Sequence, residues 1–507
     1  MIPGRLNLAA HLLDARIAEG RGDRPAIRTA TRQFSYLDMC RLSAQYASIL
    51  AADDIRPEER VIVALPDGPD FVAALFGILR RGSVVIMVNP EAPPALTQYF
   101  FEYTRATAAF IPSDRSLPFQ EATAGLSRPP RLYSVGSDEF SARVQLQPVD
   151  FAPFDSHRDD AAIWLFSGGT TGRPKGVVQT HRSFVNTTEL YGHGVLRMSA
   201  DDITISVPKL FFGYATGANL FFPFSVGASS VLFQEHSTSD TLFAQIARHR
   251  PTILVNVPSM IQQMVSHPDA RSQDFSSLRL ATSAGEALPA DLYERWMQTF
   301  GVELLDGLGT AEMWHIFISN RPGDVVPGTI GRVVPGFEVK LCDTEGRAVP
   351  DGEPGALWVK GDSRAIGYWQ QLDDTIGAFR GEWYVSGDML CRNADGTFSY
   401  CGRSDDMLKV SGKWVAPGEL ENCLLTHPAV REVAVVGVKN ADGLVKPCAF
   451  VVTALPSPAL AGELQEFVRS RLEPYKYPRQ VIFLESLPRT HLGKVDRGAL
   501  ARSATTA

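Results

Sequence analysis

A segment rich in glycines and hydroxyl groups carries the strongest chemical signal in the chain. It consists of Ser167, Gly168, Gly169, Thr170, Thr171, Gly172, Arg173, Pro174, Lys175 and Gly176. The glycines let backbone N–H groups turn toward an anion, and the hydroxyls add further donors. A purely structural turn would need neither the three hydroxyls nor the two cations. The segment therefore predicts a polyphosphate-binding loop. It is not a Walker A loop, because neither Gly-Lys pair in the chain, at 412–413 and 493–494, precedes Ser or Thr.

Short apolar runs alternate with amphipathic stretches on both sides of this loop. Strands are expected at residues 60–65, 83–88, 161–166, 202–207, 229–233, 252–256, 278–282 and 302–306. Amphipathic helices are expected at residues 70–80, 239–249 and 290–300. This alternation predicts layered α/β subdomains with mostly parallel sheets, and it places the phosphate loop directly after a strand.

The pattern changes after about residue 331. Strands expected at residues 337–342, 356–360, 389–392 and 397–401 are separated by turn signals, which indicates an antiparallel or β-barrel-like part. Residues 403–406 are polar and charged, as a linker would be. Strands at 432–438, 447–453 and 480–484 and a helix at 461–472 then predict a small α+β domain of about 100 residues.

Composition and charge narrow the class of protein. The chain has 507 residues, 45% of them hydrophobic and 21% charged, which is typical of a globular protein. Its net charge of −7 speaks against nucleic acid as a partner. No apolar run predicts a membrane-spanning helix or a signal peptide, and six scattered cysteines without metal-ligand spacing indicate reduced thiols. The expected location is therefore the cytoplasm.

Several motifs in a fixed order resemble those of the adenylate-forming superfamily of acyl- and aryl-CoA ligases, adenylation domains and luciferases. The phosphate loop is the first of them, and the resemblance extends over nearly the whole chain. The others are Gly285, Glu286 and Ala287 with Leu288 and Pro289, then Asp306, Gly307, Leu308, Gly309, Thr310, Ala311 and Glu312, then Ser386, Gly387 and Asp388, then Gly402 to Asp406, and finally Pro488 to Lys494.

The resemblance assigns a role to each motif. It implies that the phosphate loop, the turn at 285–287, residues 306–310, Asp388 and Arg403 bind ATP and AMP, with Asp388 on the ribose. Glu312 would hold Mg²⁺, and Lys494 would be the catalytic lysine that bridges carboxylate and phosphate oxygens. One departure from the family pattern is Ala311, because relatives place Thr immediately before the glutamate. The neighbouring Thr310 or backbone N–H groups are the candidates to replace that hydroxyl.

The resemblance also implies a domain organisation. Residues 1–402 would form the N-terminal adenylation domain, residues 403–406 the hinge with Asp405 as its pivot, and residues 407–507 a small mobile C-terminal domain. Rotation about the hinge would withdraw Lys494 and bring in a loop for the pantetheine arm of coenzyme A. The expected loop residues are Ser411, Gly412, Lys413 and Trp414.

Two segments, at residues 209–219 and 311–320, resemble benzoate-CoA ligases in particular. They imply an acid pocket formed by Phe212, Gly213, Tyr214, His315 and Ile316, which suits a planar ring. Such relatives tend to carry Ala where this chain has Gly213. The missing methyl group predicts space beside the ring, so that ortho-substituted benzoates, above all anthranilate, are expected substrates.

The leading hypothesis is therefore an ATP- and Mg²⁺-dependent aryl-CoA ligase that uses coenzyme A. One alternative is an enzyme that loads an aryl acid onto the phosphopantetheine of a carrier protein. Another is a non-catalytic nucleotide- or acyl-binding regulator, against which Lys494, Asp388 and Glu312 argue. The resemblance also implies a homodimer as an assembly, although no single residue identifies a dimer interface.

Overall fold

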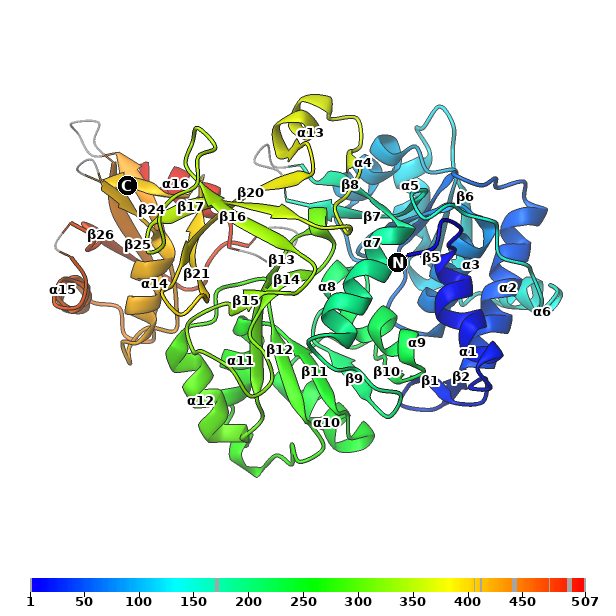
Figure 1. The fold of residues 1–507 in the computed structure, drawn as a ribbon, viewed down its shortest axis with the longest axis horizontal. Helices are drawn as coiled ribbons and strands as arrows, with labels where there is room; N and C mark the ends of the chain where they lie inside the picture. Colours follow the sequence, from blue (N-terminus) through cyan, green and yellow to red (C-terminus); the bar gives the residue numbers. More distant parts are fainter. Residues whose placement is uncertain are drawn as a thin grey trace.

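The computed structural model describes residues 2–168, 173–404, 406–410, 413–439, 445–473, 475–489 and 495–505. Two large sheets with their covering helices and a third, antiparallel sheet make up the chain as far as residue 403 (Figure 1). The elements that follow residue 406 gather at the opposite end from the N-terminal helices. The expected fold class, layered α/β subdomains with a smaller C-terminal part, is confirmed.

The first large sheet holds the phosphate loop. Its strands run in the order β18-β8-β7-β4-β3-β5-β6. Strands β6, β5, β3, β4 and β7 are parallel, whereas β8 and β18 are antiparallel to their neighbours. The bounds are β3 Arg60–Val63, β4 Val84–Met87, β5 Ala108–Pro112, β6 Arg131–Val135, β7 Ala161–Ser167, β8 Lys175–Thr180 and β18 Gly367–Tyr368.

The second large sheet has nine strands in the order β15-β14-β13-β12-β11-β9-β10-β1-β2. Its parallel centre extends from β13 to β1, and buried apolar residues cover both faces, as expected for a sheet between helical layers. The bounds are β1 Pro25–Arg28, β2 Gln33–Ser35, β9 Ile203–Ser206, β10 Ser229–Val231, β11 Ile253–Asn256, β12 Leu280–Ser283, β13 Leu304–Gly309, β14 Ile316–Ser319 and β15 Arg332–Val333.

The antiparallel part and the C-terminal part have smaller sheets. Strands β16 Glu338–Cys342, β17 Pro354–Lys360, β19 Phe379–Arg380, β20 Trp383–Arg392 and β21 Phe398–Arg403 form a five-stranded antiparallel sheet. Beyond them lie a hairpin of β22 Leu408–Val410 and β23 Lys413–Val415, and a three-stranded sheet of β24 Glu432–Lys439, β25 Val445–Val452 and β26 Gln480–Leu484.

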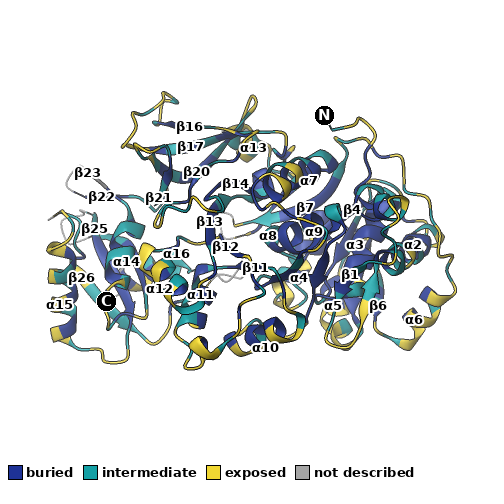
Figure 2. Cartoon of the chain, turned by 60° about the horizontal axis from the view of Figure 1, so that its bottom comes forward, coloured by how far each residue is buried: buried dark blue, intermediate teal, exposed yellow. Residues whose placement is uncertain are grey.

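Helices cover these sheets, and Figure 2 shows their buried faces turned toward the strands. In the N-terminal region they are α1 Ala15–Ala18, α2 Tyr36–Ala52, α3 Pro69–Arg81, α4 Pro94–Thr104, α5 Ser116–Thr123, α6 Asp138–Gln145 and α7 His181–Thr187. The next are α8 Gly213–Thr216, α9 Phe222–Val226, α10 Ser239–His249, α11 Pro258–Val265 and α12 Ala290–Phe300. The last are α13 Leu372–Ala378, α14 Pro417–Leu425, α15 Pro458–Arg469 and α16 Arg497–Thr505.

The expected elements are present, but some of their bounds were wrong. Strand β20 begins at Trp383, six residues before the expected start at 389, because its partner β17 continues the pairing to Lys360. Helix α15 begins at Pro458 rather than at 461, because the Ser457 side chain accepts a hydrogen bond from Leu460 N–H and caps the helix. Strands β5, β6, β8 and β14 were not expected from the sequence pattern.

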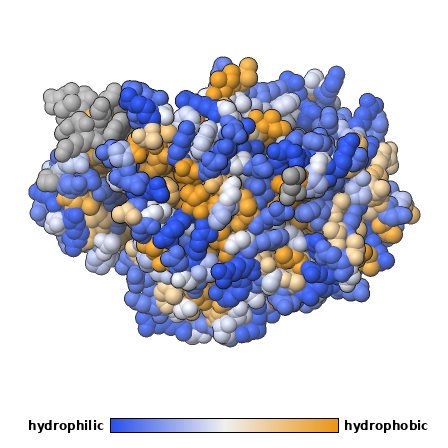
Figure 3. Space-filling view, in the orientation of Figure 1, coloured by the Kyte–Doolittle hydropathy of each residue, from blue (hydrophilic) through white to orange (hydrophobic). Residues whose placement is uncertain are grey.

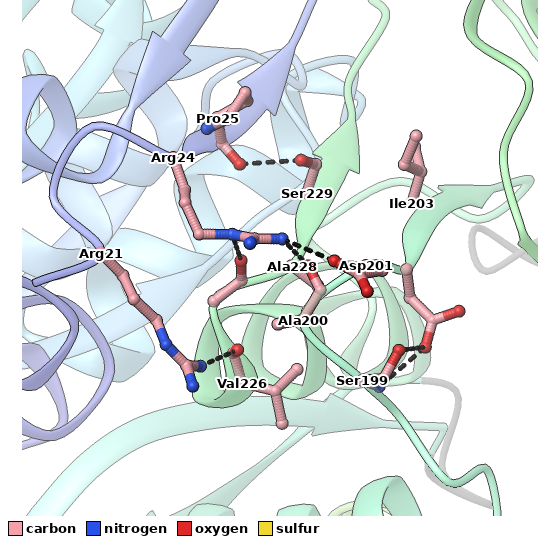
Figure 4. A network of polar contacts seen from close by, with 12 residues as sticks. Arg21, Arg24, Pro25, Ser199, Ala200, Asp201, Ile203, Val226, Ala228 and Ser229 are labelled. Carbon is pink, nitrogen blue, oxygen red and sulfur yellow. Dashed lines mark hydrogen bonds and ion pairs between the residues drawn. The ribbon is translucent and has the colours of Figure 1, made fainter. Parts of the chain in front are cut away.

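Arginines of the N-terminal segment anchor the helical segment that contains α8 and α9 (Figure 4). Arg21 donates to the carbonyl of Val226, and Arg24 donates to those of Ala200 and Gly227. The last carbonyls of a helix have no partner within the helix, so Arg21 and Arg24 satisfy the carbonyls of Val226 and Gly227 at the end of α9, whereas the Ala200 carbonyl lies outside this helix. The contact fixes the far end of the segment whose first residues form the predicted acid pocket.

All six cysteines lie among the described residues and are free thiols. Within the described ranges, no helix combines the length and the apolar composition that a membrane crossing requires.

Candidate active site

Strands β7 and β8 hold the two ends of the predicted phosphate loop. They pair in antiparallel fashion, and Ser167 lies opposite Lys175 in the register. Gly168 is exposed at the end of β7. The pairing fixes where the loop leaves and re-enters the sheet. The remaining predicted loop residues Gly169, Thr170 and Thr171 lie outside the described residues.

Lys175 is the first residue of β8, and its side chain is only 14% exposed. Its Nζ forms an ion pair of 2.9 Å with Asp374 Oδ2 of helix α13. The same Nζ lies 5.4 Å from the centre of the Tyr368 ring, within the range of a cation–π contact. Lys175 is therefore held between an acidic and an aromatic side chain at the edge of the loop.

Glu312 lies in a short 3-10 helix, Ala311–Met313, that follows β13. The residue is 5% exposed, and its Oε1 accepts a hydrogen bond of 2.9 Å from the Tyr368 hydroxyl. Thr310 caps this turn, because its hydroxyl accepts a hydrogen bond from Met313 N–H at 3.3 Å. The Thr310 hydroxyl thus has a hydrogen-bond partner of its own within this turn.

A single buried carboxylate fits Mg²⁺, which usually binds to one or two carboxylates together with substrate phosphates and waters. Among the described residues, no group of three or more His, Cys, Asp and Glu side chains could hold a metal by itself. Glu312 therefore fits an ion that arrives with ATP better than an ion held in an all-protein cage.

The predicted ribose ligand Asp388 lies on β20 beside Arg403 of β21, with which it is paired in the register. Its Oδ2 accepts from Ser386 Oγ at 2.5 Å, and its Oδ1 accepts from Tyr400 OH at 3.3 Å and from Arg403 Nη1 at 3.4 Å. A Cβ at Gly387 would clash with Arg403 Nη2, so a larger residue would displace this guanidinium from its present position. Asp388 is 6% exposed and oriented by these neighbours.

The two predicted adenine-contacting segments lie on neighbouring strands. Gly285, Glu286 and Ala287 follow β12, and Gly285 has a φ of +89°, which favours glycine. Asp306 of β13 is paired with Ser283 of β12, and burial raises the pKa of Asp306 well above its usual value. Its Oδ1 is buried without a partner among the described residues. The other members of this second segment are Gly307, Leu308 and Gly309.

The predicted acid pocket joins two segments that lie about 100 residues apart in sequence. His315 Nε2 lies 3.1 Å from the carbonyl oxygen of Tyr214, and the two rings are 5.4 Å apart. The Tyr214 hydroxyl lies 2.6 Å from Thr282 Oγ1. A Cβ at Gly217 would lie 2.3 Å from His315 Cδ2, so that glycine lets the imidazole pack against the helix backbone.

Burial gives this pocket its electrostatic character. It lowers the pKa of His315 to about 3, so the imidazole is neutral at neutral pH. Ile316 is 2% exposed and begins β14, and Phe212 immediately precedes α8. A Cβ at Gly213 would lie 3.1 Å from Leu165 Cδ1 and 3.6 Å from the Trp314 carbonyl oxygen. The pocket residues thus combine neutral aromatic surfaces with little free charge.

Sequence reasoning missed Asp67, which supports the chain just before this pocket. It is 5% exposed, and its Oδ1 accepts a hydrogen bond of 2.8 Å from Leu210 N–H. The adjacent Lys209 donates to the carbonyl of Phe233 at 3.0 Å. Burial raises the pKa of Asp67 to about 7, although nearby Lys209 acts in the opposite direction. In the sequence, Asp67 stands between Pro66 and Gly68, and this combination is typical of a turn without any further role.

Replacing Asp67 with asparagine should change how stability depends on pH. The native Asp67 binds a proton up to about pH 7 and the unfolded one only up to about pH 4, so this residue makes the native state less stable as pH rises between these values. The slope is at most about 1.4 kcal/mol per pH unit. The wild type should therefore lose stability relative to Asp67→Asn between pH 5 and pH 7 in thermal unfolding. A constant difference between the two proteins would contradict the raised pKa.

Predicted residues of the C-terminal part are only partly described. Lys494, Asp405, Ser411 and Gly412 lie outside the described residues. The backbones of Lys413 and Trp414 belong to β23, which pairs with β22.

The ends of the segment that contains Lys494 are held together. Arg489 and Val495 form an antiparallel bridge, and Asp496 N–H donates to the carbonyl of Pro488 at 2.8 Å. On the C-terminal side, Arg497 forms a bidentate ion pair with Glu421 of α14 at 2.5 and 2.9 Å.

Comparison with known proteins identifies the class. Residues 14–369 match the AMP-binding enzyme family, and residues 419–494 match the AMP-binding enzyme C-terminal domain. The chain belongs to the family of AMP-binding enzymes. Within that family it is an AMP-forming acid–thiol ligase of the aryl-CoA ligase group.

Three relatives illustrate this likeness. The benzoate–CoA ligase of Thauera aromatica is 38% identical over 507 residues, which cover 98% of this chain and 96% of the relative. The crystal structure of the anthranilate CoA ligase AuaEII in complex with anthranoyl-AMP has a TM-score of 0.95 at 35% identity, covering 100% of this chain and 98% of that one. The benzoate CoA ligase from Burkholderia xenovorans LB400 has a TM-score of 0.91 at 39% identity, covering 98% and 100%.

Proposed function

We propose that this enzyme converts benzoate or a small ortho-substituted benzoate, with anthranilate favoured, into its CoA thioester at the expense of ATP. The observation that carries the proposal is the pairing of Tyr214 with a buried, neutral His315 beside Gly213. Flat aromatic and imidazole surfaces suit a planar ring. Likeness to benzoate– and anthranilate–CoA ligases supports the same class of substrate.

In the first step a carboxylate oxygen attacks the α-phosphorus of ATP. The new O–P bond forms as the bond between the α-phosphorus and the bridging oxygen breaks, and pyrophosphate leaves. Lys175 and the loop donors bind the phosphates, Asp388 orients the ribose, and Lys494 bridges the carboxylate and phosphate oxygens. Glu312 would hold Mg²⁺, which neutralises phosphate charge when bound.

In the second step the sulfur of coenzyme A attacks the acyl carbon, and AMP leaves with the electron pair of the broken C–O bond. We assign residues 1–402 to the adenylation domain, 403–406 to the hinge and 407–507 to the small domain. Rotation about Asp405 would exchange Lys494 for the loop of Ser411, Gly412, Lys413 and Trp414. Such an exchange lets one active site perform the two steps in order.

Gly213→Ala tests the preference for an ortho substituent. An added methyl group would lie 3.1 Å from Leu165 Cδ1 and 3.6 Å from the Trp314 carbonyl oxygen. We expect this crowding to narrow the acid pocket on the side of Gly213. A methyl-sized change in a pocket is worth about 1–3 kcal/mol, so the ratio of kcat/KM for anthranilate to that for benzoate should fall at least about 10-fold. Steady-state kinetics with both acids measures this ratio. An unchanged ratio would overturn the role of Gly213.

A further inference from the structure

We infer that Asp374 is the counter-ion of Lys175 when no polyphosphate is bound and that it promotes release of pyrophosphate. The inference rests on the proposed role of Lys175 in phosphate binding. Its basis is the ion pair of 2.9 Å between Lys175 Nζ and Asp374 Oδ2. No sequence motif indicated Asp374, which lies 199 residues after Lys175 in the chain.

The fold holds Asp374 beside Lys175 through short backbone connections. Strand β18 pairs with β8, so that Tyr368 lies opposite Val177, two residues after Lys175. Helix α13 is fastened to β18, because Tyr368 N–H donates to the Thr375 hydroxyl at 3.0 Å. A Cβ at Gly367 would lie 2.7 Å from Thr375 Cγ2, so glycine permits this close approach. The β18–β8 pairing and the hydrogen bond between Tyr368 and Thr375 thus hold Asp374 next to Lys175.

Helix α13 projects from the surface above the edge of the first sheet (Figure 1). Its outer side is apolar, with Leu372 72% and Ile376 62% exposed, and Figure 3 shows apolar atoms where the helix protrudes. The first turn holds two acidic residues, Asp373 and Asp374, and among the described residues only Asp374 of these two forms an ion pair. The two residues therefore differ in their contact with Lys175 but share charge, exposure and the first turn of the helix.

The charges of the groups involved determine whether Asp374 raises or lowers the affinity for pyrophosphate. A bound polyphosphate must take Lys175 from Asp374, and the remaining carboxylate repels the same phosphates. Asp374 therefore weakens ground-state binding of pyrophosphate, and its recapture of Lys175 stabilises the protein after the product has left. The Asp374 side chain is 47% exposed, so solvent screens the interaction and the expected effect is moderate.

The contact also connects the phosphate loop with the predicted metal ligand. The Tyr368 ring lies beneath Lys175 Nζ, and its hydroxyl donates to Glu312 Oε1. A movement of Lys175 toward phosphate would break its contacts with both Asp374 and the Tyr368 ring, whereas the hydrogen bond between Tyr368 and Glu312 does not involve Lys175. Asp374 acts through Lys175 and is a positioning residue rather than a catalytic one.

Binding of inorganic pyrophosphate in the presence of Mg²⁺, measured by calorimetry on the full chain, tests the inference. Exposed ion pairs typically contribute 0.2–1 kcal/mol, so Asp374→Asn should bind pyrophosphate about 1.5- to 5-fold more tightly than the wild type. Asp374→Glu should remain close to the wild type. Asp373→Asn is the matched control and should change affinity less than Asp374→Asn. The effect of Asp374→Asn should shrink in high salt.

A second readout separates release from binding. Stopped-flow measurement of pyrophosphate release during a single turnover should give a slower release rate for Asp374→Asn than for Asp373→Asn. Equal affinities of the Asp374→Asn variant and the wild type, or equal shifts in the Asp373 and Asp374 variants, would overturn the role of Asp374 while leaving the proposed function intact. A wild type that binds no pyrophosphate would overturn both.

Discussion

Lys494→Ala is expected to slow the formation of aryl-AMP by about 10²–10³-fold, the usual cost of removing one group that stabilises the charge of a transition state. Thioester formation from supplied aryl-AMP and coenzyme A should stay close to the wild-type rate. The reason is that the small domain would have rotated Lys494 away before the second step. ATP–pyrophosphate exchange measures the first half-reaction, and thioester yield from synthetic aryl-AMP measures the second.

Lys446→Ala provides a control for this experiment, since it removes a lysine from β25 of the same C-terminal part. It should leave both half-reactions within about 2-fold of the wild type, as most surface substitutions do little. If Lys494→Ala slowed both half-reactions equally, the assignment of this lysine to adenylation alone would be wrong.

Glu312→Gln should also reduce adenylation by about 10²–10³-fold, because the amide keeps the shape of the side chain but removes its charge. The amide oxygen can still accept the hydrogen bond from the Tyr368 hydroxyl, so the surrounding structure should persist. The apparent affinity for Mg²⁺ in the presence of ATP should fall together with the rate. Titration of Mg²⁺ at fixed ATP, with Mn²⁺ binding followed by electron paramagnetic resonance, separates these two quantities.

Tyr368→Phe is the companion variant for Glu312. It keeps the carboxylate and removes one hydrogen bond to a charged group, which is worth about 1.5–3 kcal/mol. The rate should therefore fall by about 10- to 150-fold, toward but not beyond the loss caused by Glu312→Gln. Full activity of Glu312→Gln at ordinary Mg²⁺ concentrations would contradict the role assigned to Glu312.

Sequence patterns predicted most of the strands that are buried on both faces, although β5 and β14, which are also fully buried, were missed. Val84–Met87 and Ile253–Asn256 are buried at every position, and such runs stand out from their amphipathic surroundings. Strand β8 Lys175–Thr180, second from the edge of its sheet, was missed, because it follows a glycine-rich segment and its burial is interrupted. The local sequence pattern of a strand does not show which other strands pair with it.

The candidate site likewise contains residues that the sequence indicated and residues that it did not. Motifs indicated Glu312, Asp388 and His315, because their neighbours in sequence carry the resemblance. Asp67 and Asp374 were missed, because each matters through a contact with a residue far away in the chain. Only the fold brings Asp67 to Leu210 and Asp374 to Lys175. Sequence order alone gives no sign of either contact.

The measurement that tests the account most directly is product analysis by mass spectrometry. The enzyme would be incubated with ATP, Mg²⁺ and coenzyme A, together with benzoate, anthranilate, salicylate, 4-hydroxybenzoate or octanoate in separate reactions. We expect rapid formation of an aryl-CoA thioester from benzoate or an ortho-substituted benzoate, with anthranilate foremost, and none from octanoate. Aryl-AMP without any thioester would contradict the use of coenzyme A and direct attention to a carrier protein. The absence of both products would contradict the proposed function.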